Sequence, residues 1–301
     1  MPPAKPKKEP FKPTDGKTIA AKRTPKTPKA RRTARRTKLK TDAIETIFST
    51  FHAAEPEPKG ELEHVNPFTL VIAVLLSAQA TDAGVNKATR ALFAIADTPE
   101  KMLALGEDKV RDYVKTIGLY RNKAKNVILL CEKLIKEHDG EVPADRDALE
   151  QLPGVGRKTA NVVMNMAFGE PTMAVDTHVF RVSNRMGLSS GKDPLQVEED
   201  LVRIIPPAYG LHAHHWLILH GRYLCKARSP ECWRCPVAEL CLFKDKTPAP
   251  DSSEAKALKA AARAKTKKAA AKKAAAKKPL TARKPKVTNA AAGKTKQTKQ
   301  A

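Results

Sequence analysis

The chain has 301 residues and a formal net charge of +24, with 56 Lys and Arg against 32 Asp and Glu. The excess positive charge lies at the two ends. Residues 1–40 hold 15 basic and 2 acidic side chains, and residues 247–301 hold 16 and 2. The residues between them hold 25 and 28 and are close to neutral. This distribution predicts ends that bind polyanions in general, and a middle that binds one only through a local patch.

The composition also bears on the cellular compartment. No apolar run is long enough to span a bilayer, and the N-terminus lacks the apolar core of a secretory signal. The same segment is Arg-rich but also Pro-rich, which argues against an amphipathic mitochondrial presequence. We therefore expect an intracellular protein that is not secreted, cytoplasmic and nucleoid-associated if the source is bacterial.

Both ends are predicted to be tails. Residues 1–40 form a basic Pro/Thr-rich segment that cannot bury a core, so we expect disorder there. Residues 247–301 are rich in Lys and Ala and of low complexity. Ala and Lys favour helix, but no apolar stripe would hold such a helix against a core, so we expect a second disordered tail.

The middle of the chain carries helical signals from Thr41 onward, where Ile44, Ile47, Phe48 and Phe51 recur at helical spacing. A stronger signal follows at residues 66–76. Asn and Pro there form the cap and first-turn pair that opens helices, and the run FTLVIAVLL is apolar nearly all round. A helix of that kind is buried on every side, so we expect it at the centre of the fold.

Caps and breakers divide the rest of the middle into further helices. The expected N-caps are Thr81, Thr98 and Asp145, and the expected helix stops are Gly106, Gly118 and Gly140. A long amphipathic helix is predicted over Tyr120–His138, with Cys131 as a small core residue. Later helices are predicted near Thr177–Met186, 193–205 and 211–223. Strand alternation is not found in the middle, so the predicted fold is all-α.

A glycine-rich turn at residues 152–156, LPGVG, joins two of these helices. Residues 145–152 fit a short helix that Pro153 and Gly154 end, and Gly156 is expected to let the backbone turn again without a Cβ penalty. Arg157–Phe168 reads as the second helix. Free N–H groups at such a hairpin and helix N-terminus attract a phosphate. The shape alone fits an ordinary helix-turn-helix core contact equally well.

Two side chains near this turn are candidates for covalent catalysis. Lys158 lies in the first turn of its helix, where the helix dipole disfavours an ammonium, and Arg157 adds a like charge. Both effects favour the free amine that a nucleophilic lysine needs. Asp176 follows 18 residues later, behind a small apolar run. It can cap the next helix and still face a bound sugar. For an arbitrary lysine, pairing with solvent or phosphate is the far commoner role.

Four cysteines, Cys225, Cys232, Cys235 and Cys241, have the pattern C-x6-C-x2-C-x5-C. Four thiolates can hold a zinc ion or an iron–sulfur cluster. Zinc sites usually pair two short knuckles and this pattern has one, so the spacing favours a [4Fe–4S] cluster. The loop after the first cysteine contains Lys226 and Arg228, which such a cluster would present to phosphates. The nearby His212, His214 and His215 are expected to be core or backbone-bonding histidines.

The segments LPGVGRKTANVV and AVDTHVFRV closely resemble endonuclease III, a DNA glycosylase/lyase family of the helix-hairpin-helix superfamily. LLSAQATD, KTIGLY and HHWLILHGRYLC agree in order and spacing, and the resemblance covers residues 41–246. It implies a two-lobed fold. Residues 60–170 would form a six-helix barrel domain with the hairpin, and residues 41–59 with 171–246 would form an iron–sulfur cluster domain.

The resemblance also implies an activity: removal of oxidised pyrimidines from duplex DNA, then nicking 3′ to the abasic site by β-elimination. Lys158 would attack C1′ of the flipped nucleotide, and Asp176 would stabilise the developing charge and assist proton transfer. Gln79 and Leu119 would fill the gap left by the flipped base. The cysteines would hold a [4Fe–4S] cluster. We expect a monomer that binds duplex DNA, with no further cofactor and no membrane partner.

Two alternatives stay open at this point. Adenine-specific monofunctional glycosylases share the cysteine pattern, but they carry no lysine at the nucleophile position. They have a catalytic Glu where this chain has Leu75, and they append a folded C-terminal domain. A non-enzymatic protein that packages DNA through its tails would not need Lys158 and Asp176 together.

Overall fold

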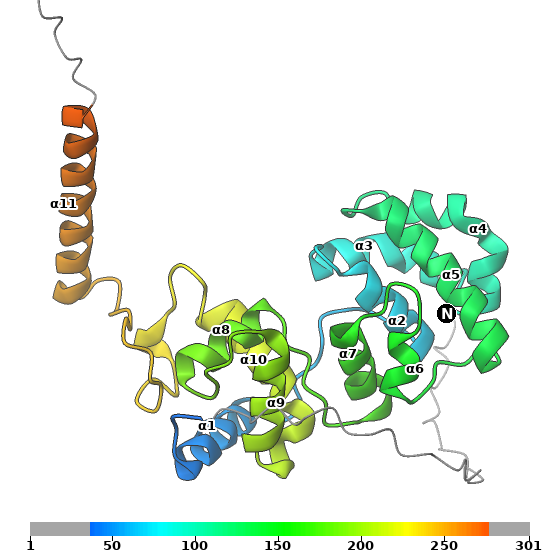
Figure 1. The fold of residues 1–301 in the computed structure, drawn as a ribbon, viewed down its shortest axis with the longest axis horizontal. Coiled ribbons are helices and arrows are strands. Elements are labelled where there is room, and N and C mark those ends of the chain that lie inside the picture. Colours follow the sequence, from blue (N-terminus) through cyan, green and yellow to red (C-terminus); the bar gives the residue numbers. More distant parts are fainter. Residues whose placement is uncertain (1–36, 277–301) are drawn as a thin grey trace, which may run out of the picture. The chain divides into compact units, whose positions relative to one another are not determined.

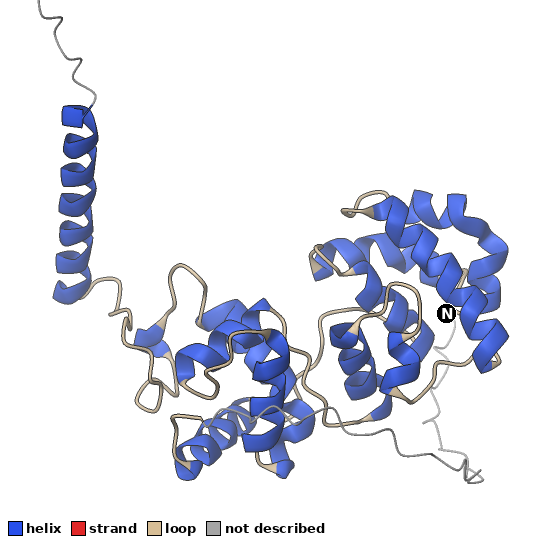
Figure 2. Cartoon of the chain, in the orientation of Figure 1, coloured by secondary structure: helices blue, strands red, loops and turns tan. Residues whose placement is uncertain are grey.

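The structure is a computed structural model, and it describes residues 37–276. Within that range the chain forms helices joined by loops, and Figure 2 shows no strand among these residues. The all-α prediction is therefore confirmed. Residues 1–36 and 277–301, which hold most of the two predicted tails, lie outside the described residues.

The central helix of the first half is α2 (Pro67–Leu76), in which every residue after the first is buried. Asn66 accepts a hydrogen bond from the Thr69 N–H at 2.8 Å, and the Thr69 hydroxyl closes a reciprocal capping box. Proline at the first helical position costs nothing, because that N–H has no partner inside a helix. Cap and proline together explain why the helix begins where the sequence predicts.

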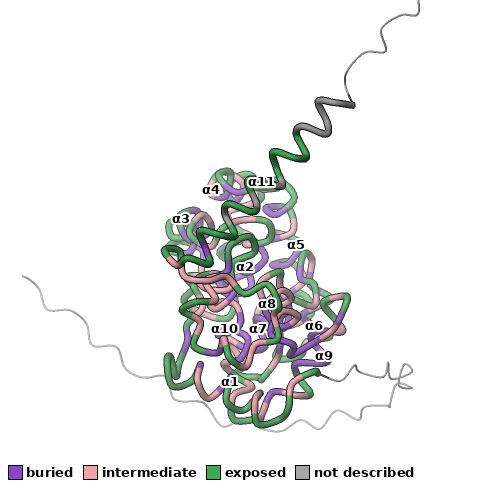
Figure 3. Tube along the Cα trace, turned by 90° about the vertical axis from the view of Figure 1, so that its left-hand side faces the viewer, coloured by how far each residue is buried: buried purple, intermediate pink, exposed green. Residues whose placement is uncertain are grey.

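Five further helices enclose α2 and share one apolar core with it, which runs from Phe68 to Met164 (Figure 1). They are α3 (Asp82–Phe93), α4 (Pro99–Val114), α5 (Tyr120–His138), α6 (Arg146–Glu150) and α7 (Arg157–Phe168). Helix α2 contacts α3, α5 and α7 directly. Figure 3 shows buried residues, coloured purple, recurring along these helices. The central position predicted for α2 is confirmed.

A second apolar core combines the start of the described chain with its later part. Its helices are α1 (Thr41–Ala54), α8 (Thr177–Met186), α9 (Pro194–Ile204) and α10 (Gly210–Leu219). Ile47 and Phe48 of α1 are fully buried in it, beside Trp216 and Val237. We propose that these two cores define two domains with the predicted boundaries, because no residue of the second core lies between 52 and 172.

The local signals are confirmed at the predicted N-caps, since Thr81, Thr98 and Asp145 each accept a backbone N–H. Gly106 interrupts α4 as predicted: its backbone is non-helical, with φ of 76° and ψ of 164°, and it separates two helical segments. One predicted helix end is wrong. The last predicted helix ends early at Leu219, and a wider π-helical turn, His220–Leu224, continues the chain. Such turns often occur at functional sites.

The structure also differs from the prediction at the beginning of the second tail, where Ser253–Ala276 forms helix α11. Ala and Lys are strong helix formers and need no core to favour this conformation. The segment before α11 is also anchored. The Thr247 hydroxyl donates to the Pro230 carbonyl and accepts from the Cys232 N–H, and Ala255 is buried.

Candidate active site

The glycine-rich turn lies between α6 and α7, with Leu152 and Val155 buried beneath it. Gly154 has φ of 80°, and a Cβ there would lie 2.9 Å from Leu75 Cδ1. Only glycine fits this position. Gly156 is different: its φ is −99° and nothing lies within 4 Å of its Cβ position. The expected conformational need for glycine at Gly156 is therefore wrong, and the residue instead leaves open space at the N-cap of α7.

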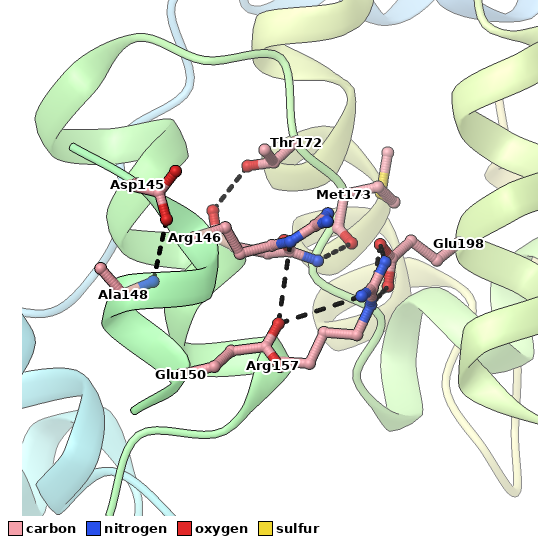
Figure 4. A network of polar contacts seen from close by, with 9 residues as sticks. Asp145, Arg146, Ala148, Glu150, Arg157, Thr172, Met173 and Glu198 are labelled. Atoms are coloured by element: carbon pink, nitrogen blue, oxygen red, sulfur yellow. Dashed lines mark hydrogen bonds and ion pairs between the residues drawn. The ribbon is translucent and has the colours of Figure 1, made fainter. Parts of the chain in front are cut away.

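Arg157 is held by two carboxylates, as Figure 4 shows. Its guanidinium donates to both oxygens of the buried Glu198, at 2.8 and 2.9 Å. Glu150 of α6 lies 3.9 Å away and also pairs with Arg146. The hydrogen bonds to Glu198 raise the Arg157 pKa above its ordinary value. The expectation that Arg157 acts on its neighbour as a like charge needs correction, because Glu198 largely neutralises it.

Lys158 lies in the first turn of α7 and is exposed. Among the described residues no carboxylate forms an ion pair with its Nζ. Its neighbour Arg157 is turned toward Glu198, so the two adjacent cations have separate surroundings. The amine is therefore open to a reacting group.

Asp176 is the N-cap of α8, as predicted, and one carboxylate oxygen accepts the N–H groups of His178 and Val179, both at 2.8 Å. The strand-like segment before it is held by α7. The Asn161 side chain donates to the Met173 carbonyl at 3.0 Å, and the Thr172 hydroxyl donates to the Asn161 carbonyl. The cap commits one oxygen of Asp176 and leaves the other available to the space beside it.

Lys158 and Asp176 line one open cavity of about 620 Å³. Its apolar wall is formed by Val74, Val162, Met166, Ile218 and Leu219, and its polar lining by Lys59, Glu61, Ser77, Asp82, His214, His215 and Arg222. The lining comes from the chain before α2, from α2, α3 and α7, and from α10 with the turn that follows it. The cavity therefore combines both halves of the described chain.

Four charged residues of this lining were missed by the sequence analysis: Lys59, Glu61, Asp82 and Arg222. Arg222, in the π-helical turn, donates to Glu61 and, at 2.8 Å, to Asp82. The Tyr223 hydroxyl donates to Glu61 as well. The buried Asn86 holds the Glu61 segment in place by donating to the Glu61 carbonyl at 2.8 Å. Arg222 and Asp82 are 140 residues apart, so no local pattern signals their pairing.

His214 is a core residue, as expected. Its ring is 2% exposed, and its Nδ1 and that of His215 are buried with no hydrogen-bond partner in the described chain. Burial lowers the His214 pKa to about 3, with smaller contributions from His215 and Lys158. Burial also lowers the His215 pKa. Both rings are thus neutral at neutral pH.

Gln79 and Leu119 share an unusual backbone conformation. Their φ angles are 55° and 58°, and Asp139 at the end of α5 is the third non-glycine residue with positive φ among residues 37–276. A left-handed conformation costs a residue with a Cβ about 1–2 kcal/mol, and such strain gathers at functional sites. Both side chains are exposed. A Cβ at Gly118 would lie 3.7 Å from the Gln79 carbonyl, so the two turns are neighbours.

The four predicted cysteine ligands line one cavity of about 350 Å³. No three His, Cys, Asp or Glu side chains of the described chain converge on a single ion position. The thiols instead surround a space, which fits the donor set of a cluster. Burial raises the Cys235 pKa to about 11, so a bound metal is what would release its proton. Cys131, far from this set in the sequence, is fully buried as predicted, and burial raises its pKa to about 12.

Two arginines of α8 hold the cysteine loop, and the sequence analysis missed both. Arg185 donates to the carbonyls of Lys226 and Ala227 at 2.8 Å, and it lies 3.6 Å from Cys225 Sγ. Arg181 donates to the Cys225 carbonyl at 3.1 Å. Their spacing on α8 puts them on one helix face, which is the signal that could have found them.

The two predicted cations of this loop, Lys226 and Arg228, have different surroundings. Lys226 pairs with Glu231 at 2.6 Å. Its hydrogen bond to Glu231 and a second one from Arg234 lower the Glu231 pKa. Arg228 is exposed, and no ion pair to it is found in the part of the chain that is described. Arg228 is therefore the more available of the two for a phosphate.

Comparison with known families identifies the class of protein. Residues 72–207 match the family model of the HhH-GPD superfamily of base excision DNA repair proteins. Residues 225–241 match the iron–sulfur binding domain of endonuclease III. The chain is thus a helix-hairpin-helix protein of base excision DNA repair with an iron–sulfur domain. None of its described helices is long and apolar enough to cross a bilayer.

Individual relatives identify the family. Endonuclease III of Rickettsia conorii (strain ATCC VR-613 / Malish 7) is 57% identical over 203 residues, which are 67% of this chain and 97% of that protein. Endonuclease III of Escherichia coli (strain K12) is 56% identical over 66% of this chain and 95% of that protein. A trapped covalent endonuclease III–DNA intermediate is similar in structure, with a TM-score of 0.64 and 50% identity over 67% of this chain and 96% of that one. The chain belongs to the endonuclease III family.

Proposed function

We propose that Lys158 and Asp176 carry out the chemistry of this protein, a bifunctional DNA glycosylase and abasic-site lyase of base excision repair. The observation that supports these roles is their convergence on one cavity. Lys158 offers an unpaired amine from the start of α7, and Asp176 offers one uncommitted carboxylate oxygen from the start of α8. A nucleophile beside an acid–base group is the arrangement that amine catalysis needs.

In the first step a flipped nucleotide brings its C1′ to the Lys158 amine. The new C–N bond forms as the N-glycosidic bond breaks, and the base leaves with the bonding electrons and takes up a proton. Asp176 stabilises the positive charge that develops on the sugar and moves the protons. The positive charge on the sugar and the Asp176 carboxylate interact more strongly in a partly enclosed cavity than they would in water.

In the second step the amine and the opened sugar form a Schiff base. Loss of a C2′ proton then expels the 3′ phosphate, which nicks the strand 3′ to the abasic site, and hydrolysis of the imine releases Lys158. The substrate class is the oxidised pyrimidine in duplex DNA. The alternative of a monofunctional adenine glycosylase has no support, since Leu75 is a core residue that contacts the Gly154 turn.

The remaining candidates hold the DNA. Gly154 and Gly156 expose the backbone of the hairpin at the N-terminus of α7, where a phosphate can approach. Gln79 and Leu119 project from adjacent turns and fill the gap in the duplex. Lys226 and Arg228 contact phosphates from the cysteine loop. The [4Fe–4S] cluster, held by Cys225, Cys232, Cys235 and Cys241, keeps this loop in shape.

We also propose a monomer, because one chain supplies the complete lining of the cavity. A duplex DNA substrate and strongly basic ends favour association with the nucleoid in a bacterial cell.

The test is borohydride trapping on a duplex that contains one oxidised thymine. Wild-type protein should form a permanent protein–DNA adduct, because borohydride reduces the Schiff base. Lys158→Ala should form none. Lys158 is exposed, so the variant should keep its cluster and its melting temperature. Arg157→Lys is a useful neighbour control, since it changes the adjacent residue but keeps a cation beside Glu198 and leaves the Lys158 amine in place. Equal trapping by wild type and Lys158→Ala would contradict the proposed role.

A further inference from the structure

We propose that His214, with His215 beside it, hydrogen bonds to the carbonyl and N–H edge of the base flipped into the cavity, and so selects the lesion. This inference rests on the proposed function, in which Lys158 and Asp176 receive a flipped nucleotide. It adds the residues that read the base, whereas those two act on the sugar.

The first observation is where the unpaired polar atoms lie. His214 and His215 are the only residues of the cavity lining that have a buried side-chain polar atom without a partner in the described chain. Their rings lie edge to face, with centroids 5.2 Å apart and an interplanar angle of 68°. Buried polar groups are nearly always paired, and two neighbouring unpaired ring nitrogens at one cavity point to a ligand of that cavity as their partner.

The second observation is the protonation state of the pair. Both rings have pKa values below the ordinary histidine range because they are buried, and His214 reaches about 3. A neutral imidazole offers one donor and one acceptor. The edge of thymine alternates carbonyl, N–H and carbonyl, and it keeps this pattern when oxidation saturates the 5,6 bond. Two neutral rings therefore match the edge that oxidised thymines share.

The third observation is that other polar groups of the cavity already have hydrogen-bond partners within the protein. Arg222 is shared between Glu61 and Asp82, and the Ser77 hydroxyl donates to the Val74 carbonyl. These polar groups are already committed. Lys158 and His214 line the same cavity, so the amine and the ring share one space. A nucleotide that brings C1′ to Lys158 would thus bring its base toward the histidines.

The fourth observation is the wall around the rings. Gly60 closes the cavity against α7, since a Cβ there would lie 2.7 Å from Met166 Cε and 3.6 Å from His215 Nε2. Val162 of α7 and Ile218 of α10 add apolar surface. Aliphatic side chains and a flexible methionine adapt to a ring that has lost its planarity. Shape and polarity of the cavity are thus both suited to a saturated pyrimidine.

The experiment compares two duplexes in single-turnover reactions, one with an oxidised thymine and one with a preformed abasic site. His214→Leu has a similar size and no hydrogen-bonding group. It should cut the oxidised thymine roughly 10- to 100-fold more slowly, as expected when one buried hydrogen bond is lost. Borohydride trapping on the abasic duplex should stay near the wild-type yield, because that substrate has no base to read.

His214→Asn keeps polar atoms close to the position of Nδ1 and should recover much of the rate. His215→Leu should show the same split between substrates. His212→Leu is the matched control, since this histidine of the same helix packs against Trp216 and does not line the cavity. It should cut both duplexes like wild type.

Each other result overturns the proposal. An unchanged rate on oxidised thymine in His214→Leu would show that the ring does not contact the base. An equal loss on both duplexes, or a loss that follows the melting temperature across the variants, would make the ring a support for Lys158 or for the core. Failure of the proposed function is separate: it would appear as trapping that survives in Lys158→Ala.

Discussion

The cavity around Lys158 and the loop around the four cysteines are built in different ways. The cavity is formed by the ends of regular helices, and hydrogen bonds within the protein hold each element, such as the Asp176 cap and the Arg157–Glu198 pair. The cysteine loop has only a short 3-10 turn, Cys232–Arg234, and depends on arginines of α8. The comparison suggests that the catalytic geometry comes from the polypeptide, whereas the loop geometry needs its cluster.

The largest expected effect tests the cavity. Asp176→Asn should lower the single-turnover rate by about 10²- to 10⁴-fold, the usual loss when one acid–base group is removed. Asn also caps helices well, so α8 should persist and the melting temperature should change little. Rate and circular dichroism measured on the same preparation decide this. A large loss of stability would mean that the carboxylate holds the fold more than it serves the reaction.

The next effect tests the loop. Cys235→Ser should lose most of its iron and sulfide, because a cluster held by four thiolates loses one of its ligands. Affinity for DNA should fall at least about tenfold, a range typical of disrupted metal-site surroundings. Wild type should hold about four irons and about four sulfides. Arg185→Met should have a smaller effect on DNA affinity, because it removes hydrogen bonds to the loop but keeps all four thiols. If Cys235→Ser bound DNA normally, the loop would not need its cluster.

A third effect concerns the basic ends. A chain of residues 37–252 keeps Thr247 and its bonds to the cysteine loop and removes most of the tail charge. Each phosphate contact contributes roughly 0.9 to the log–log salt slope, so the slope for undamaged duplex should flatten by several units. The single-turnover rate on a lesion should stay close to that of the full chain. An unchanged slope would limit the tails to a role in solubility, and a slower rate would bring them into the active site.

The shorter chain of residues 37–246 makes a matched comparison, since it lacks only Thr247 to Ser252 in addition. Its affinity for DNA should be lower than that of the 37–252 chain, by more than the difference in charge explains. The reason is that the Cys232 N–H then has no side-chain acceptor. Equal behaviour of the two chains would show that the loop does not depend on this anchor.

The smallest effect depends on pH. His214 has a pKa of about 3 in the folded chain against an ordinary value of 6.5, so the unfolded chain binds more protons between these values. The stability that comes from keeping His214 neutral is present above pH 6.5 and is lost as the pH falls toward 3. The melting temperature of wild type should therefore fall more steeply from pH 7 to pH 5 than that of His214→Leu. Cluster absorbance, recorded alongside, separates this effect from acid loss of the cluster. Parallel curves would contradict the assignment.

Local signals predicted much of this molecule. The bounds of α5, α7 and α8 follow from periodicity and caps, and the spacing of Lys158, Asp176 and the cysteines defined the candidate chemistry. These features depend on residues that are near each other in the chain. The π-helical turn after Leu219 was missed, because a widened turn has the same apolar pattern as the helix it continues.

Long-range pairs account for the rest. Arg222 reaches Glu61 and Asp82 across 161 and 140 residues, and Arg157 reaches Glu198 across 41. Each of these residues looks like ordinary surface charge in the sequence. Their pairing depends on how the helices pack, so only the folded chain reveals which charges are neutralised. The unpaired state of His214 is equally invisible in the sequence, since it is a property of every group that surrounds the ring.

At Gln79 and Leu119, whose backbone is left-handed, selection for stability and selection for DNA repair favour different residues. Glycine at either position would relieve about 1–2 kcal/mol of backbone strain in the folded chain. The greater conformational freedom that glycine gives the unfolded chain would offset about 0.4–1 kcal/mol of this gain. The folded protein would gain stability and lose the side chain that we propose enters the duplex. A lineage that adapts only to heat would tend toward glycine at these turns, and a lineage under mutagenic load would keep the strained residues.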